Sequence, residues 1–299
     1  MRAQLTHSLT YRYEAPVQLG EHRLCLRPRA QGHQHLIEHS LRITPEPSHS
    51  HDLLAASGDA IQRVRFFGPT DALHIQASSL VVTHPAAPLL DCFNGLEPPL
   101  PYPRRQLNQD LLGALEGWLP NGQHDPSAVE LAQDALMGSN QQVLPFLHQL
   151  MEMIQDRVKY TQRHAGPAWP AGRTLRERIG SCRDLAMLMT ECCRSIGLPA
   201  RFASGYHLAD PAPQSYDLHA WTEVYLPGAG WRGFDPSAGG EITERYIVLA
   251  SSSKPDLTAA VCGTFSGPPG TVSELSWLIE AMVESESDQN HAPSLIQAA

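Results

Sequence analysis

The stretch that decides the fold runs from Gly180 to Pro236. It contains four blocks: Gly180-Ser181-Cys182-Arg183-Asp184-Leu185-Ala186, Pro199-Ala200-Arg201-Phe202-Ala203-Ser204-Gly205-Tyr206, His219-Ala220-Trp221-Thr222-Glu223-Val224-Tyr225-Leu226 and Gly230-Trp231-Arg232-Gly233-Phe234-Asp235-Pro236. A cysteine at a predicted helix start is followed by a histidine that opens a predicted strand and an aspartate that ends the next strand. These three residue types can form a Cys-His-Asp catalytic triad.

Cys182 is predicted at the first position of an amphipathic helix. Ser181 and Asp184 form a capping-box pattern. Apolar residues recur behind them with helical spacing, namely Leu185, Leu188, Met189, Cys192 and Ile196. Free backbone N–H groups and the positive end of the helix dipole favour a thiolate at such a position. The alternative is a small buried cysteine, because free cysteines are common in protein cores.

His219 opens a predicted strand that ends at Leu226, and the returning strand is predicted from Trp231 to Asp235. Side chains alternate between the two faces of a strand. One face of the first strand therefore carries His219, Trp221, Glu223 and Tyr225. Residues 227–230 form the predicted turn between the two strands.

The register of this hairpin is left open by the sequence. A four-residue loop would place Asp235 opposite Thr222, about 10 Å along the strand from His219. A different turn, or a bulge at Gly230 or Gly233, would bring the two side chains closer. The alternative to a paired His219 and Asp235 is that His219 is a half-exposed strand residue and Asp235 a turn residue, with no shared role.

The four blocks resemble the core of the transglutaminase-like superfamily, specifically its bacterial cysteine-protease-like members. The family pattern is G-x-C-x-D-x-A, then R-x-x-G-x-P-A-R-x-x-x-G-Y, then H-A-W-x-E-V, then G-W-x-x-x-D-P-[ST]. This chain matches it at Gly180, Cys182, Asp184, Ala186, Arg194, Gly197, Pro199, Ala200, Arg201, Gly205, Tyr206, His219, Ala220, Trp221, Glu223, Val224, Gly230, Trp231, Asp235, Pro236 and Ser237. The resemblance implies a papain-like α+β core in which Cys182 is the nucleophile, His219 the base and Asp235 the orienting acid.

Residues 1–85 are predicted to form an N-terminal β-sandwich, because short β-prone runs are separated there by Pro, Gly, Ser and Asp. This region resembles the N-terminal domain of the bacterial family at His7, Thr10, Tyr11, Tyr13, Leu26, Arg27 and Pro28. Two H-x-H pairs among its histidines could place side chains on one strand face and bind a metal. These histidines are nevertheless interpreted as strand and loop surface, since no clustered cysteine or acidic ligands accompany them. They are His33, His35, His39, His49 and His51.

The other predicted segments are a Pro-rich linker over 86–126, a catalytic core over 127–270 and a C-terminal strand with a disordered tail over 271–299. Helices are expected at 127–137 and 143–158. A short helix capped by Thr174 is expected before Gly180. The stretch 272–283 alternates as a strand does, although a helix is not excluded by its pattern.

Three further positions bear on the triad. His207 is a rival base, and Asp217, two residues before His219, is a rival carboxylate. The bacterial relatives often have a histidine where this chain has Tyr246. This departure is expected to affect packing or contacts around the triad and not the triad itself.

The composition of the chain indicates which binding partners and which cellular location to expect. The chain has 299 residues and a net charge of -9 without a long basic run, so nucleic acid and anionic membrane surfaces are not expected partners. No apolar stretch approaches the ~20 residues of a membrane span, and the N-terminal residues lack the apolar region of a signal peptide. The six cysteines lack C-x-x-C spacing, which favours reduced thiols and a cytoplasmic location. No cofactor and no metal are expected.

The sequence therefore predicts a thiol-dependent acyl-transfer enzyme that hydrolyses peptide or amide bonds through a thioester. The first alternative is a transglutaminase that passes the acyl group to an amine, and the second is a non-catalytic peptide-binding module. The expected partner is a peptide, protein or amide substrate. The resemblance also implies a pathway link to ATP-grasp ligase-like proteins, and the sequence makes no prediction of oligomeric state.

Overall fold

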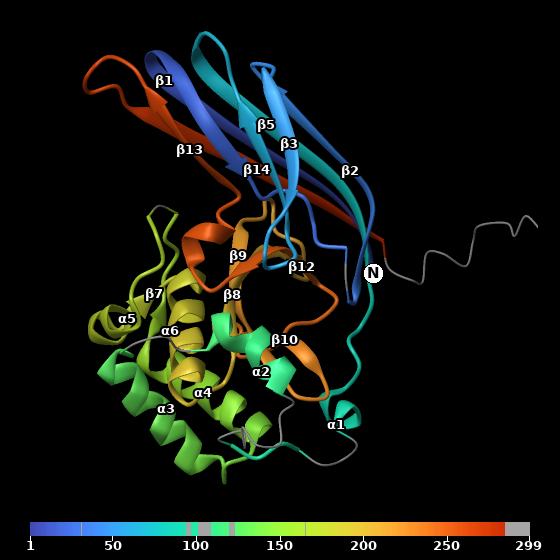
Figure 1. The fold of residues 1–299 in the computed structure, drawn as a ribbon, viewed down its shortest axis with the longest axis vertical. Helices are drawn as coiled ribbons and strands as arrows, with labels where there is room; N and C mark the ends of the chain where they lie inside the picture. The colour runs from blue at the N-terminus through green and yellow to red at the C-terminus, as the bar shows by residue number, and fades with distance from the viewer. Residues whose placement is uncertain (31, 94–96, 101–108, 120–122, 165, 285–299) are drawn as a thin grey trace, which may run out of the picture.

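The computed structural model of the protein describes residues 1–30, 32–93, 97–100, 109–119, 123–164 and 166–284. This described part is α+β, as the sequence predicts. An antiparallel seven-stranded sheet lies above a core in which helices pack on an antiparallel five-stranded sheet (Figure 1).

The core sheet has the strand order β11-β10-β9-β8-β12. Its strands are β8 (Ala200–His207), β9 (Leu218–Leu226), β10 (Gly230–Asp235), β11 (Gly240–Glu241) and β12 (Tyr246–Ser252). The helices of the core are α3 (Pro126–Gly138), α4 (Val143–Arg157), α5 (Ala171–Glu177) and α6 (Cys182–Ser195). A short parallel pair, β6 (Lys159–Tyr160) and β7 (Ile179–Gly180), leads into α6.

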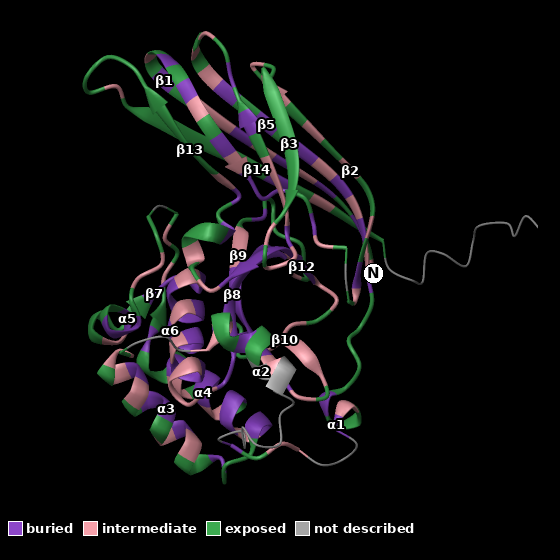
Figure 2. Ribbon diagram, in the orientation of Figure 1, coloured by how far each residue is buried: buried purple, intermediate pink, exposed green. Residues whose placement is uncertain are grey.

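The core forms because α3, α4 and α6 each turn an apolar stripe toward one another and toward the sheet. Leu147, Leu188, Met189, Val224 and Phe234 are fully buried in one cluster that joins α4, α6, β9 and β10. Strand β8 is buried along nearly its whole length, as Figure 2 shows. The helix α6 is therefore held firmly on the sheet, and its N-terminus has a fixed place beside β9.

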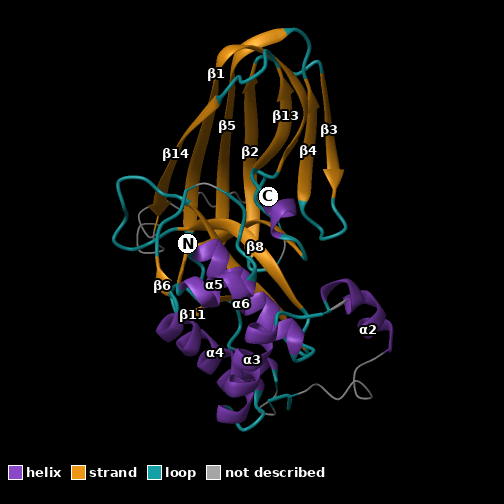
Figure 3. Cartoon of the chain, turned by 90° about the vertical axis from the view of Figure 1, so that its left-hand side faces the viewer, coloured by secondary structure: helices purple, strands orange, loops and turns teal. Residues whose placement is uncertain are grey.

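The β structure predicted for the N-terminal region is present, but its described strands form one sheet and not the two packed sheets of the predicted sandwich. The strand order is β2-β5-β1-β4-β3, and β13 and β14 also pair with β1. Its strands are β1 (Arg2–Leu24), β2 (Gln34–Thr44), β3 (His49–Leu54), β4 (Ala60–Arg65), β5 (Pro69–Thr83), β13 (Val261–Ser266) and β14 (Ser273–Glu284). Figure 3 shows these strands standing above the helices of the core. The first and the last strands of the described chain are thus neighbours.

The C-terminal part of the chain completes this N-terminal sheet. Strand β14 pairs with β1 from Arg2↔Glu284 to Tyr13↔Ser273, and β13 pairs with β1 from Gln18↔Ser266 to Leu24↔Val261. The expectation of a strand at 272–283 is confirmed. The boundary at residue 270 was wrong for 261–266, because β13 belongs to the upper sheet. The cause is that β1 spans 23 residues, and one of its long edges would otherwise remain unpaired.

Two further expectations need correction. The predicted linker 86–126 contains α1 (Leu89–Cys92), α2 (Gln109–Leu115) and the 3₁₀ turn Glu116–Trp118, while 94–96, 101–108 and 120–122 lie outside the described residues. Helix α5 begins at Ala171, with Pro170 before it. Thr174 is buried inside that helix and does not cap it. The predicted disordered tail, 285–299, also lies outside the described residues.

A buried ion-pair network holds the two parts together. Arg29, on the segment after β1, donates to Asp59 at 2.9 Å and to Glu223 of β9 at 3.2 Å. Arg201 of β8 donates to the same Glu223 at 2.6 Å, and its guanidinium lies 4.1 Å from the centre of the Trp231 ring. These charged side chains are at most 12% exposed. Arg201 and Glu223, two residues of the sequence blocks, thus join the upper sheet to the core.

Replacing Arg29 by alanine should destabilise the fold by roughly 3 kcal/mol, because it leaves buried carboxylates without their cation. Guanidinium unfolding of the variant measures this loss. Arg65→Ala is the matched control. Its ion pair with Glu21 is exposed, so less than about 1 kcal/mol should be lost. Equal losses in the two variants would contradict the role given to the buried network.

Across the described residues, no helix combines the length and apolar character needed to cross a bilayer.

Candidate active site

The start of α6 is built around the carboxylate of Asp184. Its Oδ2 accepts the backbone N–H and the hydroxyl of Ser181, each at 2.8 Å, and its Oδ1 accepts the N–H of Trp169 at 2.8 Å and the Arg163 guanidinium at 2.6 Å. Burial raises the pKa of Asp184, but these bonds outweigh burial and hold the pKa below its usual range. The capping residues are therefore those that the sequence predicts, and they fix the position of Cys182 at the first helical turn.

The Cys182 backbone N–H faces no hydrogen-bond acceptor in the part of the chain that the structure describes, whereas the N–H groups of Asp184 and Leu185 already donate to Ser181. The first N–H groups of a helix are unpaired within the helix itself. This free amide next to the sulfur can therefore donate to a negatively charged oxygen.

The hairpin β9–β10 has a shorter loop than the sequence predicts. Leu226 pairs with Gly230, so the loop has three residues and Phe234 lies opposite Thr222. Gly228 and Gly230 have φ values of 89° and 71°, which a glycine adopts readily. The shorter loop carries Asp235 one residue further along β9 than a four-residue loop would. It reaches the level of Trp221, on the face that also carries His219.

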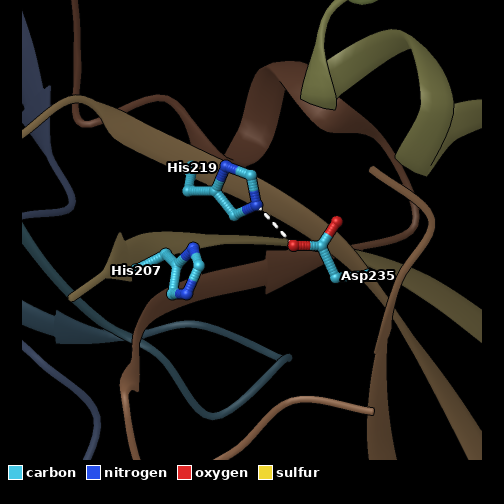
Figure 4. A group of neighbouring side chains, drawn as sticks. All are labelled: His207, His219 and Asp235. Atoms are coloured by element: carbon cyan, nitrogen blue, oxygen red, sulfur yellow. Dashed lines mark hydrogen bonds and ion pairs between the residues drawn. The ribbon is translucent and has the colours of Figure 1, made fainter. Parts of the chain in front are cut away.

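His219 Nε2 donates to Asp235 Oδ2 at 2.6 Å, as Figure 4 shows. The same Oδ2 accepts the hydroxyl of Tyr246 at 2.9 Å, and Oδ1 accepts the N–H and hydroxyl of Ser237 at 2.9 and 2.6 Å. Burial raises the pKa of Asp235, but the bonds from His219, Ser237 and Tyr246 outweigh burial and lower the pKa to about 2. Asp235 is therefore a carboxylate at neutral pH, oriented by every group around it.

The position of Tyr246 agrees with the expectation that it affects the surroundings of the triad. Its hydroxyl donates to Asp235, and its ring stacks on that of His207. Burial raises the pKa of this hydroxyl, and the charge of Asp235 adds to the effect. The Tyr246 hydroxyl therefore keeps its proton at neutral pH and donates a hydrogen bond to Asp235.

The imidazole ring of His219 carries the positive charge of the site. Burial lowers its pKa, but the bond to Asp235 and the interaction with Cys182 outweigh burial and raise the pKa to about 10. Because Nε2 is engaged by Asp235, Nδ1 is the ring nitrogen left to exchange a proton with the Cys182 thiol. The structure thus brings together all three residues named from the sequence, Cys182, His219 and Asp235, and the arrangement stabilises a charged imidazolium.

The two rival residues, His207 and Asp217, lie near His219 but have other partners. His207 stacks on Tyr246, with ring centres 4.2 Å apart, and its ring centre is 5.5 Å from that of His219. Burial and the neighbouring charge of His219 lower the pKa of His207. Asp217 accepts Gln162 Nε2 and Trp277 Nε1, each at 2.8 Å, and so is occupied away from His219.

Among the described residues, the group His207, His219 and Asp235 is the one whose ligand atoms gather closely enough to suggest a metal site, within 4.8 Å of one another. His219 Nε2 and Asp235 Oδ2 are 2.6 Å apart, closer than the roughly 3.3 Å that separates two ligand atoms around a tetrahedral zinc. Zinc needs each ligand atom at about 2.0–2.2 Å. The arrangement therefore fits a hydrogen-bonded pair and not a metal centre.

A pocket of about 350 Å³ opens over Cys182 and His219. The core contributes Gln162, Phe202, Asp217 and neighbouring residues. The upper sheet contributes the other wall, with His7, Leu9 and Tyr11 from β1 and Leu275 and Trp277 from β14. Sequence reasoning missed this wall. The alternation of Leu275, Trp277 and Ile279 indicated a strand, but nothing local indicated that the strand returns to β1.

Alkylation should discriminate among the cysteines. Cys192 and Cys193 are fully buried on α6, and burial raises the pKa of both thiols, to about 12 for Cys193. Cys182 opens into the pocket beside His219. Limiting iodoacetamide near neutral pH, followed by mass spectrometry, should therefore label Cys182 well before Cys192 or Cys193.

The control for this experiment is His219→Ala, which should slow labelling of Cys182 and leave the exposed Cys262 unchanged. Earlier labelling of Cys192 or Cys193 in the folded protein would refute the assignment of the reactive thiol.

Comparison with known proteins gives two matches to family models. Residues 130–236 match the transglutaminase-like superfamily, and residues 3–82 match the bacterial transglutaminase-like N-terminal region. An uncharacterized protein of Mycobacterium tuberculosis, Rv2569c, is 26% identical over 261 residues, which cover 83% of this chain and 82% of that protein. Over 67 residues the chain is 34% identical to a protein-glutamine gamma-glutamyltransferase of Pseudomonas aeruginosa, covering 20% of this chain and 10% of that protein.

Among solved structures, a candidate cysteine protease from Cytophaga hutchinsonii superposes with a TM-score of 0.70 at 20% sequence identity. The superposition covers 95% of this chain and 92% of that protein. At this level of identity the likeness concerns the fold, including the placing of the N-terminal β domain on the core.

Proposed function

We propose that this chain is a thiol-dependent acyl-transfer enzyme that hydrolyses peptide or amide bonds through Cys182. The matches of residues 130–236 to the transglutaminase-like superfamily, which is thiol-dependent, and of residues 3–82 to the bacterial transglutaminase-like N-terminal region support this proposal. The observation that carries the proposal is the 2.6 Å bond between His219 and Asp235, with Cys182 beside His219 in one pocket. This arrangement has the three parts that nucleophilic catalysis by a thiol requires: a nucleophile, a base and a group that orients the base.

The first half of the reaction forms a thioester. The Cys182 thiol passes its proton to His219 Nδ1, and the thiolate attacks the carbonyl carbon of the substrate. The negative oxygen of the tetrahedral intermediate accepts the Cys182 N–H at the start of α6. The C–N bond then breaks, and the leaving amine takes the proton from the His219 imidazolium.

The second half releases the acyl group. Neutral His219 accepts a proton from water as the water oxygen attacks the thioester carbonyl. The C–S bond breaks, the acyl group leaves as a carboxylic acid, and the Cys182–His219 pair is restored. Throughout, the Asp235 carboxylate holds the ring by Nε2 and balances the imidazolium charge.

An amine can replace water in the second half, and the product is then a new amide. The short match to the Pseudomonas protein-glutamine gamma-glutamyltransferase favours this alternative. The triad serves both outcomes equally. The third possibility, a non-catalytic peptide-binding module, is disfavoured because a binding site needs neither the reactive thiol nor its charged partner.

The test uses a library of acetylated peptides that contain internal glutamine, incubated with the full chain in heavy-oxygen water, with and without dansylcadaverine. We expect products whose new carboxylate carries one heavy oxygen atom, formed by the unsubstituted protein and not by Cys182→Ala. Dansylated products in excess of hydrolysis would establish transamidation instead. If neither product forms and no acyl group is found on Cys182 by mass spectrometry, the proposal is wrong.

A further inference from the structure

Strand β14 is an edge strand beside the pocket. It pairs with β1 along one edge, from Ser273 to Glu284. On its other edge, the backbone of Ile279 accepts the N–H of Tyr216 at 3.1 Å. Between Ser273 and Trp277, that outer edge meets no backbone partner within the described parts of the chain. Figure 3 shows β14 at the margin of the upper sheet.

The direction of the free backbone groups follows from two hydrogen bonds. Glu14, just beyond the end of the ladder, donates to Val272, so the even-numbered residues of this strand direct their N–H and C=O toward β1. The Ile279 carbonyl points the opposite way, toward Tyr216. Because the direction alternates along an antiparallel strand, Leu275 and Trp277 present their N–H and C=O groups at the outer edge.

These two residues also lie on the pocket. Leu275 and Trp277 line it together with Cys182 and are 41% and 37% exposed. The Trp277 indole donates to Asp217, two residues before His219, which fixes the edge relative to the triad. The free edge of β14 is therefore continuous with the space in which the reaction is proposed to occur.

We propose that the substrate is an extended polypeptide segment that adds as a strand to the outer edge of β14 at 275–277 and so presents a peptide carbonyl to Cys182. This inference rests on the proposed function and names its substrate class. Strand addition supplies affinity through main-chain hydrogen bonds, and alternate side chains supply specificity. The apolar side chains of Leu9, Tyr11 and Leu275 in the pocket favour an apolar residue in the segment that pairs with β14.

The decisive variant is Leu275→Pro, compared with Leu275→Ala. Both remove the isobutyl group of leucine, but only proline also removes the outward N–H. Since that N–H is not bonded to β1, proline is tolerated at this edge position. For a peptide selected from the library, we expect the proline variant to have a KM roughly tenfold above that of the alanine variant, from one lost hydrogen bond.

Val283→Pro is the matched control. The N–H and C=O of Val283 also point to the outer edge of β14, but this residue lies outside the pocket. This variant should leave KM unchanged. The alkylation rate of Cys182 by iodoacetamide should be the same in all three variants, since this small reagent needs no strand pairing. Chromatography with light scattering reports whether two copies of the chain pair through β14.

Equal KM values for Leu275→Pro and Leu275→Ala, with normal peptide hydrolysis by the unsubstituted protein, would overturn this inference alone. A dimer that dissociates in Leu275→Pro, with no change in KM, would assign the edge to a second copy and overturn it as well. Absence of any peptide turnover by the unsubstituted protein would overturn the proposed function, and this inference with it.

Discussion

Cys182→Ala is expected to lower the turnover of peptide substrates to the background rate, because the thiol of Cys182 is the nucleophile of the proposed reaction. Loss of the nucleophile in a triad costs on the order of 10⁶ in kcat. The fold should be retained, since alanine fills most of the volume of cysteine and favours the helix. Initial rates with the library-selected peptide, together with circular dichroism, measure the two effects.

Cys192→Ala provides the matched control, because it removes a thiol from the same helix at a site remote from the pocket. It should keep nearly full turnover at a moderate loss of stability. Substantial turnover by Cys182→Ala would show that the thiol is not the nucleophile, and an equal loss in Cys192→Ala would show that the effect is one of folding.

Asp235→Asn is expected to reduce kcat by roughly 10–10³. In serine enzymes the equivalent change costs on the order of 10⁴, but a thiol already forms an ion pair with its histidine before attack, which makes the loss smaller. Asparagine can still contact His219, yet it cannot balance the imidazolium charge. Turnover against pH, with the folded fraction checked by unfolding, measures the effect.

The pKa of His219 determines in which direction Asp235→Asn shifts the pH profile of activity. The pKa of His219 is raised to about 10, largely by Asp235, so the imidazolium form persists until the pH rises through that value. Without the carboxylate the pKa of His219 should fall, and the alkaline limit of activity should move to lower pH. The contribution of His219 to the free energy of unfolding is fully present below pH 6.5 and is lost as the pH rises through about 10. The contribution of Asp235 to the free energy of unfolding is present above pH 3.8 and is lost as the pH falls through about 2.

Asp217→Asn is the control for this pair. Asp217 bonds Gln162 and Trp277 and does not reach His219, so its replacement should affect KM for peptides more than the alkaline limit. If Asp217→Asn moved that limit and Asp235→Asn left it in place, Asp217 would be the partner of His219 and the triad would have to be rewritten.

Local patterns in the sequence were sufficient for the elements of the site. The capping residues Ser181 and Asp184 place Cys182 at a helix start because the interactions involved span three residues. The period of two along β9 puts His219 and Trp221 on one face for the same local reason. The four blocks together also carried the recognition of the superfamily and the α+β class, and both are confirmed.

The tertiary structure alone decided how these elements meet. The distance between His219 and Asp235 depends on one residue of loop length between β9 and β10, which no local preference sets. The pairing of β14 with β1 joins residues more than 250 positions apart. The entropy cost of bringing such distant residues together is offset only by the interactions of the completed sheet. The pocket wall formed by Leu275 and Trp277 is a consequence of this long-range pairing. The sequence by itself therefore determined the reactive elements, and the tertiary structure determined the space in which a substrate can reach them.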